Sequence, residues 1–182
     1  EILNEILQQD LAFCGDSMQL DLDKLQQLSS ARQRQLLSVW MKGQDTYRPA
    51  FEMVQRLQDE VICSKTDSQA ALHWNHFYYI RYQKQLYRLE KATYLSSKSV
   101  EIAQPQDVYF QLGQDFSCLS GHFLPENNKI GLSFALLNQK LTLSSRQGGE
   151  KIHLYGRVGT WSLKKAIQDA QIFPWLRHTI QI

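Results

Sequence analysis

The chain has 182 residues, 43% of them hydrophobic and 21% charged, with a formal net charge of +2. This composition is that of a globular protein and excludes a disordered chain. No apolar run approaches the ~20 residues that a membrane helix needs, and three widely spaced cysteines without a CxxC pair are typical of a reducing compartment, so we expect a cytoplasmic protein without membrane contact.

The charges are distributed unevenly along the chain. Residues 1–70 carry 7 Lys and Arg against 11 Asp and Glu, residues 71–139 carry 6 against 5, and residues 140–182 carry 7 against 2. A basic C-terminal end suggests a polyanionic partner for that end. The alternative is a solvated face that happens to be basic, and charge alone does not decide between the two.

The first half of the chain is expected to be helical. Apolar residues recur at helical spacing from residue 2 onward with no capping residue before them, and residues 179–182 alternate like a strand to the last residue. We therefore expect a piece of a longer protein. The expected helix boundaries are Asp21 and Asp23 before a short helix, Ser29 or Ser30 before a longer one, Gly43 at its end, and Pro49 in the first turn of the next.

The residue composition changes after residue 70. Residues 72–82 and 85–89 are aromatic-rich and β-favouring, and Gln83-Lys84 between them predicts a hairpin turn. Residues 91–107 are polar and contain Pro105, which is typical of a linker.

The last part of the chain alternates between strands and turns. Residues 108–112, 129–137 and 140–146 predict strands, and a glycine-rich stretch, 146–160, precedes a short helix. In that helix Leu163, Ala166, Ile167 and Ala170 are expected to be buried, with Lys164 and Lys165 on the opposite face. The expected fold class is α+β, with a helical domain and β-hairpin in 1–91, a linker in 92–107 and a small mixed α/β domain in 108–182.

Catalytic signatures are missing from the sequence. It contains no GxxxxGK[ST], GxGxxG, HExxH or GxSxG motif and no pair of carboxylates placed for acid–base chemistry. His73 and His76 would lie on opposite faces of a strand, so we expect no metal site there. We nominate no catalytic residue.

Two clusters of cations could bind nucleic acid. In the hairpin, Arg81, Lys84 and Arg88 alternate with tyrosines, side chains that suit phosphates and unstacked bases. The alternative is a ribbon with one face in the core and one charged face in water, which we favour for this cluster.

The second cluster lies in the basic C-terminal part. Lysines in the first turn of a helix are mildly unfavourable unless an anion binds there, and four glycines between 148 and 159 would let backbone N–H groups approach a phosphate. We favour phosphate binding for this cluster, whose members are Arg146, Lys151, Arg157, Lys164, Lys165 and Arg177.

Four short motifs carry a family resemblance. R-x-G-G-E-K (146–151), G-R-x-G-T (156–160), L-K-K (163–165) and I-x-P-W-L-R (172–177) resemble the C-terminal domain of bacterial tRNA(Ile)-lysidine synthases. Residues 20–44, the Pro49 helix and 80–89 resemble the substrate-recognition domain of that family. The order of the parts is kept, although Glu150-Lys151 stands where the family commonly has Asp-Arg, and the final run would normally continue past Ile182.

The resemblance implies a function for the whole enzyme and a part of it for this chain. In that family an N-terminal PP-loop domain uses ATP and Mg²⁺ to adenylate the wobble cytidine of the CAU anticodon of tRNA(Ile). Lysine then displaces AMP, which changes codon reading from AUG to AUA and identity from Met to Ile. The PP-loop motif Ser-Gly-Gly-x-Asp-Ser is absent here, so the resemblance implies an ATP-dependent ligase whose tRNA-binding part is this chain, inactive alone.

Two other interpretations stay open at this point. One is an accessory RNA-binding module of another tRNA enzyme. The other is a protein-interaction or dimerisation module that docks a partner, including a second copy, through the aromatic hairpin.

Overall fold

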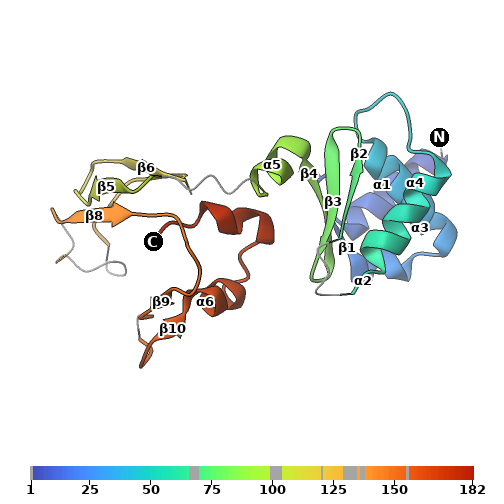
Figure 1. Cartoon of the computed structure of the whole chain (residues 1–182). Helices are drawn as coiled ribbons and strands as arrows, with labels where there is room; N and C mark the ends of the chain where they lie inside the picture. The colour runs from blue at the N-terminus through green and yellow to red at the C-terminus, as the bar shows by residue number, and fades with distance from the viewer. Residues whose placement is uncertain are drawn as a thin grey trace. The chain divides into compact units, whose positions relative to one another are not determined.

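The structure, a computed structural model, describes residues 2–65, 70–98, 104–119, 121–128, 135, 138–154 and 156–182. Contacts divide the chain into two compact units, Glu1–Leu95 and Ser96–Ile182. Both kinds of secondary structure occur, as helices and small antiparallel sheets (Figure 1), so the expected α+β class is confirmed. In the described ranges no helix combines the length and apolarity needed to span a membrane.

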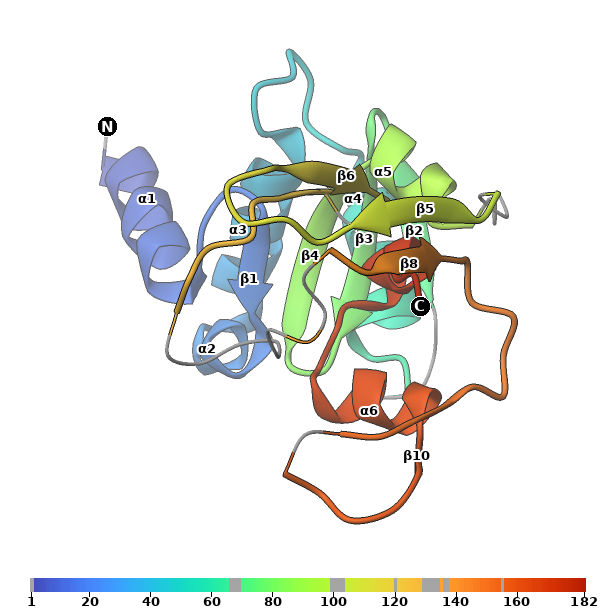
Figure 2. The same cartoon turned by 90° about the vertical axis from the view of Figure 1, so that its left-hand side faces the viewer.

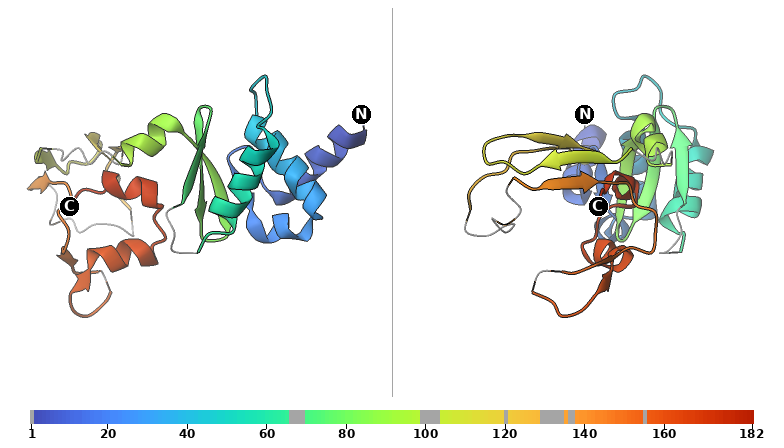
Figure 3. Two further views of the ribbon diagram at one scale, coloured as in Figure 1. Left: turned by 45° about the vertical axis from the view of Figure 1, so that its right-hand side comes forward. Right: turned by 60° about the vertical axis from the view of Figure 1, so that its left-hand side comes forward.

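The first unit is a four-stranded antiparallel sheet with α1 to α4 packed on one of its faces (Figures 1 and 3). The strands run in the order β1-β4-β3-β2. They are β1 (Gln19–Asp21), β2 (Ala71–Trp74), β3 (Phe77–Tyr82) and β4 (Gln85–Glu90). The helices are α1 (Ile2–Cys14), α2 (Leu22–Gln27), α3 (Ser30–Lys42), α4 (Phe51–Arg56), the π-helix η1 (Leu57–Ile62) and α5 (Lys91–Ser96).

Side-chain caps determine where α2 and α3 begin. The Asp21 carboxylate accepts the N–H of Lys24 at 3.0 Å, and the Ser29 hydroxyl accepts the N–H of Arg32 at 3.5 Å. Each cap satisfies an N–H group that the first helical turn leaves unpaired. Both boundaries are confirmed.

Gly43 and Pro49 were both expected to mark helix boundaries, and only one of the two does so. Gly43 ends α3 as expected, with a φ of +52° that favours glycine. Pro49 does not lie in the first turn of α4, because Ala50 is the N-cap residue and the helix begins at Phe51. That expectation was wrong by two residues.

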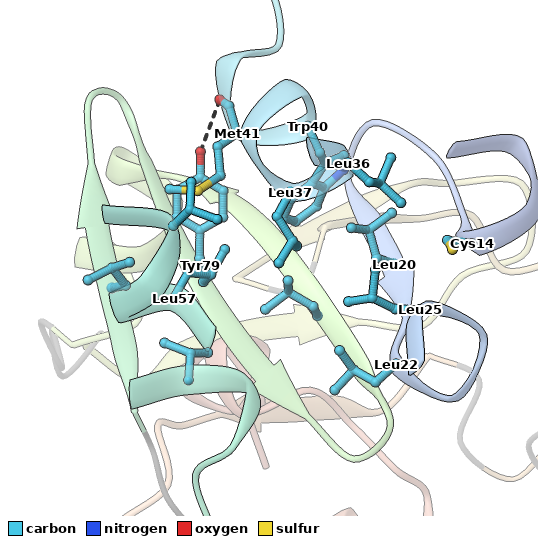
Figure 4. Packing of buried hydrophobic residues seen from close by; sticks show 14 of the residues in the cluster. Cys14, Leu20, Leu22, Leu25, Leu36, Leu37, Trp40, Met41, Leu57 and Tyr79 are labelled. Carbon is cyan, nitrogen blue, oxygen red and sulfur yellow. Dashed lines mark hydrogen bonds between the residues drawn. The ribbon is translucent and has the colours of Figure 1, made fainter. Parts of the chain in front are cut away.

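The core of the first unit lies between its helices and the sheet (Figure 4). Leu36, Leu37 and Met41 of α3 are fully buried against it. Tyr79 of β3 is also fully buried, and its hydroxyl donates to the Met41 carbonyl oxygen at 3.2 Å. Burial raises the pKa of the Tyr79 hydroxyl far above its ordinary value, so the phenol stays a neutral donor that connects the sheet to the end of α3.

Helix α1 is only partly covered by this core. Leu7 is buried, and the buried Asp10 carboxylate forms an ion pair with Arg32 of α3. Ile2 and Leu3, expected on the apolar stripe, are 74% and 58% exposed. The stripe is therefore buried only in its second half.

The sheet departs from the expected single hairpin. The expected strand 72–82 is two strands, β2 and β3, separated by a turn at Asn75 and His76, where Asn75 has a φ of +51°. The turn at Gln83-Lys84 is confirmed, with Gln83 at a φ of +55°. Strand β1 was not expected because it has only three residues; its Leu20 lies opposite Leu86 of β4.

The described residues of the second unit form three two-stranded sheets and two short helices. The polar segment expected as a linker begins with helix α5, and most of the expected strand 129–137 lies outside the described residues. The pairs are β5 (Gln106–Tyr109) with β8 (Lys140–Leu143), β6 (Phe116–Cys118) with β7 (Gly121–Phe123), and β9 (Lys151–Ile152) with β10 (Trp161–Ser162). The helices are α6 (Leu163–Asp169) and the 3₁₀-helix η3 (Pro174–Thr179).

The apolar stripe expected on helix α6 is buried only in part. Leu163 and Ile167 are buried and Ala166 is partly buried, whereas Ala170, just after the helix, is exposed. The expected strand at 179–182 is limited to a bridge between Gln181 and Ser145, because η3 extends through Thr179.

Candidate nucleic-acid interface

Arg88 of the hairpin is part of the core and is withdrawn as a candidate. The residue is 6% exposed, and its guanidinium lies 3.8 Å from the centroid of the Phe77 ring. Its Nη1 donates to the Trp40 carbonyl oxygen at 3.0 Å, near the end of α3. A cation held this way caps a helix terminus and has no surface to offer a phosphate.

The other two hairpin cations also have partners in the chain. Arg81 donates from Nη1 to the carbonyl oxygens of Ile62 and Ser64, at 2.7 and 2.9 Å, and so closes the end of η1. Lys84 forms an exposed ion pair with Asp23 at 2.6 Å, which raises its pKa. These contacts favour the structural interpretation of the hairpin cluster.

The C-terminal candidates divide into two groups. Four of them lie in the β9–β10–α6 segment, and two of these four contact one aromatic ring. Strand register places Lys151 opposite Ser162, directly before α6, whose first turn carries Lys164 and Lys165. Arg157 lies in the loop between β9 and β10. Figure 2 shows α6 continuing directly from β10. We call this set the Trp161 cluster: Lys151, Arg157, Trp161, Lys164 and Lys165.

Trp161 contacts two of these cations, which was not expected. The guanidinium carbon of Arg157 lies 4.7 Å from the ring centroid, and the Nζ atom of Lys165 lies 5.5 Å from it. Both distances are within the range of a cation–π contact. The signal was present in the sequence, since Arg157, Trp161 and Lys165 are spaced by four residues, but it requires the β10–α6 junction to bring them together.

The cations of the Trp161 cluster are exposed and keep their charge available. Among the described residues, no carboxylate oxygen lies within 4.0 Å of any of the four. Even Asp169, one turn after Lys165 in α6, does not pair with it. The set therefore carries four exposed positive charges that no carboxylate of the described chain neutralises.

The glycine loop before β9 differs from the expected phosphate cradle. Gly148 and Gly149 have φ values of +95° and +83°, and a Cβ at either would meet open space, so the glycines serve the backbone conformation. The Glu150 carboxylate accepts the N–H groups of Gln147 and Gly148, at 2.5 and 2.6 Å. These hydrogen bonds, chiefly that from Gly148, lower the pKa of Glu150.

The start of α6 is likewise partly occupied. The N–H of Leu163 donates to the Glu150 carbonyl oxygen at 2.9 Å, and the helix has only seven residues. Positive charge near this start therefore comes from the lysine side chains rather than from a long helix. The expectation of free amides around a phosphate was wrong for Gly148.

Arg146 and Arg177 do not join the Trp161 cluster. Arg146 is half-buried beside the glycine loop, and in the described part of the chain its Nε has no hydrogen-bond partner. Arg177 donates from Nε to the Ile172 carbonyl oxygen at 2.9 Å, beyond the end of α6 opposite to Lys164. Among the residues that the structure describes, neither makes a cation–π contact with Trp161.

The histidine pair considered for a metal is placed differently from the expectation. His73 lies in β2, whereas His76 lies in the turn to β3 and not in a strand. In the ranges that the structure covers, no three His, Cys, Asp or Glu side chains gather in a way that could hold a metal ion.

Comparisons with known proteins bear on the same two regions. The model of the TilS substrate binding domain matches residues 20–87, and that of the TilS substrate C-terminal domain matches residues 141–182, which together are more than half of the chain. A tRNA(Ile)-lysidine synthase of Acinetobacter baylyi is 62% identical over 182 residues, all of this chain and 39% of the relative. Enzymes of the same name from Shigella flexneri and Legionella pneumophila are 28% and 27% identical, over 98% and 88% of this chain and 40% and 36% of theirs. The chain thus spans about two fifths of the length of these relatives.

Proposed function

Because the chain belongs to the tRNA(Ile)-lysidine synthase family, of which it carries the TilS substrate-binding and C-terminal domains, we propose that it binds a tRNA and positions it for modification. The Trp161 cluster is the observation that carries this proposal. Four exposed cations without carboxylate partners in the described chain can neutralise RNA phosphates, which provide most of the affinity in nucleic-acid binding.

The proposal extends to the reaction that the bound tRNA would undergo. The substrate is tRNA(Ile) with a CAU anticodon, and a catalytic domain outside these residues joins lysine to its wobble cytidine with ATP and Mg²⁺. The product reads AUA instead of AUG and is charged with isoleucine instead of methionine. This chain supplies no catalytic residue in the proposal, so it is inactive alone, and the enzyme works in the cytoplasm.

Within the cluster the roles follow from the side chains. Lys164 and Lys165 act as point charges on the backbone of the RNA, while the planar guanidinium of Arg157 can hold a phosphate with two hydrogen bonds. The Trp161 ring holds Arg157 and Lys165 in place before the RNA arrives, which reduces the entropy lost on binding.

The test is a binding measurement over a salt series. A tRNA transcript with a CAU anticodon is titrated with the wild-type chain and with Lys164→Ala/Lys165→Ala. We expect affinity to fall about tenfold and the slope of log K against log salt to shrink by about 1.4 to 1.8, as for two lost phosphate contacts. The control, Lys24→Ala/Lys140→Ala, removes two charges elsewhere and should change neither.

Two outcomes would overturn the proposal. Equal affinity and salt slope for the lysine variant and its control would remove the Trp161 cluster from the interface. A chain that forms a stable dimer by light scattering and does not bind the transcript would instead favour the protein-interaction module.

A further inference from the structure

We propose that a groove between α3 and α4 of the first unit is a second tRNA contact, which binds a backbone phosphate and a neighbouring base. The groove is about 340 Å³ in volume, the size of a small-ligand site. Helix α3 contributes Arg34, Gln35 and Ser38, and the segment leading into α4 contributes Arg48, Pro49 and Phe51. The proposal rests on the proposed function, since it identifies where the first unit would contact the same RNA.

The arginines of the first unit distinguish this groove from the rest of its surface. The unit has six arginines, and four of them have partners in the chain. Arg32 pairs with Asp10, Arg56 pairs with Glu60, Arg81 donates to two carbonyl oxygens, and Arg88 is buried against Phe77.

The two remaining arginines, Arg34 and Arg48, are both exposed and both line the groove. No carboxylate of the described chain lies within ion-pair distance of either. Since residues 1–70 carry more acidic than basic side chains, two unpaired guanidinium groups in one groove are a local reversal of the charge of the unit.

The other lining groups fit a nucleotide. No carboxylate lines the groove, and the Gln35 amide and Ser38 hydroxyl can donate to phosphate or ribose oxygens. Phe51 is 62% exposed at the edge, and an exposed ring beside arginines can stack on an unpaired base. Guanidinium groups bind phosphate through two parallel hydrogen bonds, so the set favours RNA over an acidic peptide.

The experiment separates the charge from the ring. A CAU-anticodon tRNA transcript is titrated with the whole chain, with Arg34→Gln/Arg48→Gln and with Phe51→Ala. The arginine variant should bind about tenfold more weakly with a salt slope smaller by about 1.4 to 1.8. The Phe51 variant should bind about fivefold or more weakly with an unchanged salt slope, because stacking involves no phosphate charge.

The matched control is Lys24→Gln/Arg56→Gln, which removes the same charge from the same unit outside the groove. If the groove variants bind the transcript as tightly as this control, the second contact is wrong while the proposed function stands. If the wild-type chain does not bind the transcript, the proposed function fails and the groove proposal fails with it. Circular dichroism of each variant excludes unfolding as the cause, and all three substituted groove side chains are exposed.

Discussion

The two units of the chain bury their apolar side chains to very different extents. In the first unit a continuous cluster extends from Cys14 to Leu86 and includes fully buried residues of α3, η1 and the sheet. In the described part of the second unit, the buried apolar residues are Val108, Leu163, Ile167 and Trp175. The first unit is thus held by a core, and the second more by turns and short sheets.

This difference explains why the cations of the hairpin are used within the fold, whereas those around β9 and β10 are exposed. In the first unit, Arg81 and Arg88 of the hairpin donate to carbonyl oxygens near the ends of η1 and α3. In the second unit the short strands β9 and β10 and the loop between them leave Lys151 and Arg157 exposed. A small core leaves more polar surface for a ligand, at the expense of stability from burial.

The largest effect should come from truncating a core residue in each unit. Leu37→Ala in α3 should lower the free energy of unfolding of the first unit by about 2–5 kcal/mol, because Leu37 is fully buried in a dense cluster. Ile167→Ala in α6 should cost the second unit about 1–2 kcal/mol, because fewer buried neighbours surround it. Hydrogen exchange measured peptide by peptide gives the loss of stability of each unit separately. Equal losses in the two units would contradict the difference in core packing.

A smaller effect is expected from glycines with positive φ. A Cβ at Gly43 would collide with the guanidinium group of Arg88. Gly43→Ala should therefore destabilise the first unit by about 1–3 kcal/mol, through backbone strain and displacement of that cation. Gly113 of the second unit has a φ of +75° but open space around it. Gly113→Ala should therefore cost about 1 kcal/mol, and thermal melts of both variants measure the difference.

Replacing the Trp161 ring should affect binding more than stability. Trp161→Leu leaves every cation in place but removes the two cation–π contacts, so tRNA affinity should fall roughly threefold to tenfold with no change in salt slope. Fluorescence anisotropy over a salt series checks both values. A smaller salt slope for Trp161→Leu would mean that loss of the ring also breaks a contact between a cation and a phosphate.

The smallest effect is expected at Glu150. Glu150→Gln removes a negative charge beside the glycine loop, so tRNA affinity should rise roughly twofold to fivefold.

Because hydrogen bonds lower the folded pKa of Glu150, its contribution to stability is present above the unfolded pKa of about 4.3 and is lost as pH falls through the folded pKa. The amide shifts of Gln147 and Gly148, followed by NMR, should therefore titrate with a midpoint below 4.3, and a midpoint above it would contradict the assignment.

Local chemistry made much of the fold predictable. Ser29, Asp21 and Gly43 mark helix ends through hydrogen bonds and backbone conformation that depend on a few neighbouring residues. Strand β1 was missed because three residues are too few to show an alternating pattern, and its ladder forms with the distant strand β4. The turn at Asn75 was missed because an aromatic run favours a continuous strand.

The candidate site was predictable where exposure follows from helical spacing. Lys164 and Lys165 fall opposite Leu163 and Ile167 and are exposed as expected. Arg88 was wrongly included among the candidate phosphate ligands. It alternates with Tyr87 in β4 and therefore lies on the same face as the buried Leu86. Arg34 and Arg48 were missed because they are fourteen residues apart and meet only when α3 and α4 pack together.

The π-helix η1 has a consequence for how this region can change in length. The N–H of Cys63 donates to the carbonyl oxygen of Gln58, five residues earlier, at 2.8 Å. A wide turn of this kind takes up one residue more than an ordinary helical turn over the same rise. Deleting one residue between Leu57 and Ile62 would let the turn close with the narrower spacing while its neighbours keep their positions. This stretch can therefore tolerate a single-residue deletion that the tightly wound α3 cannot.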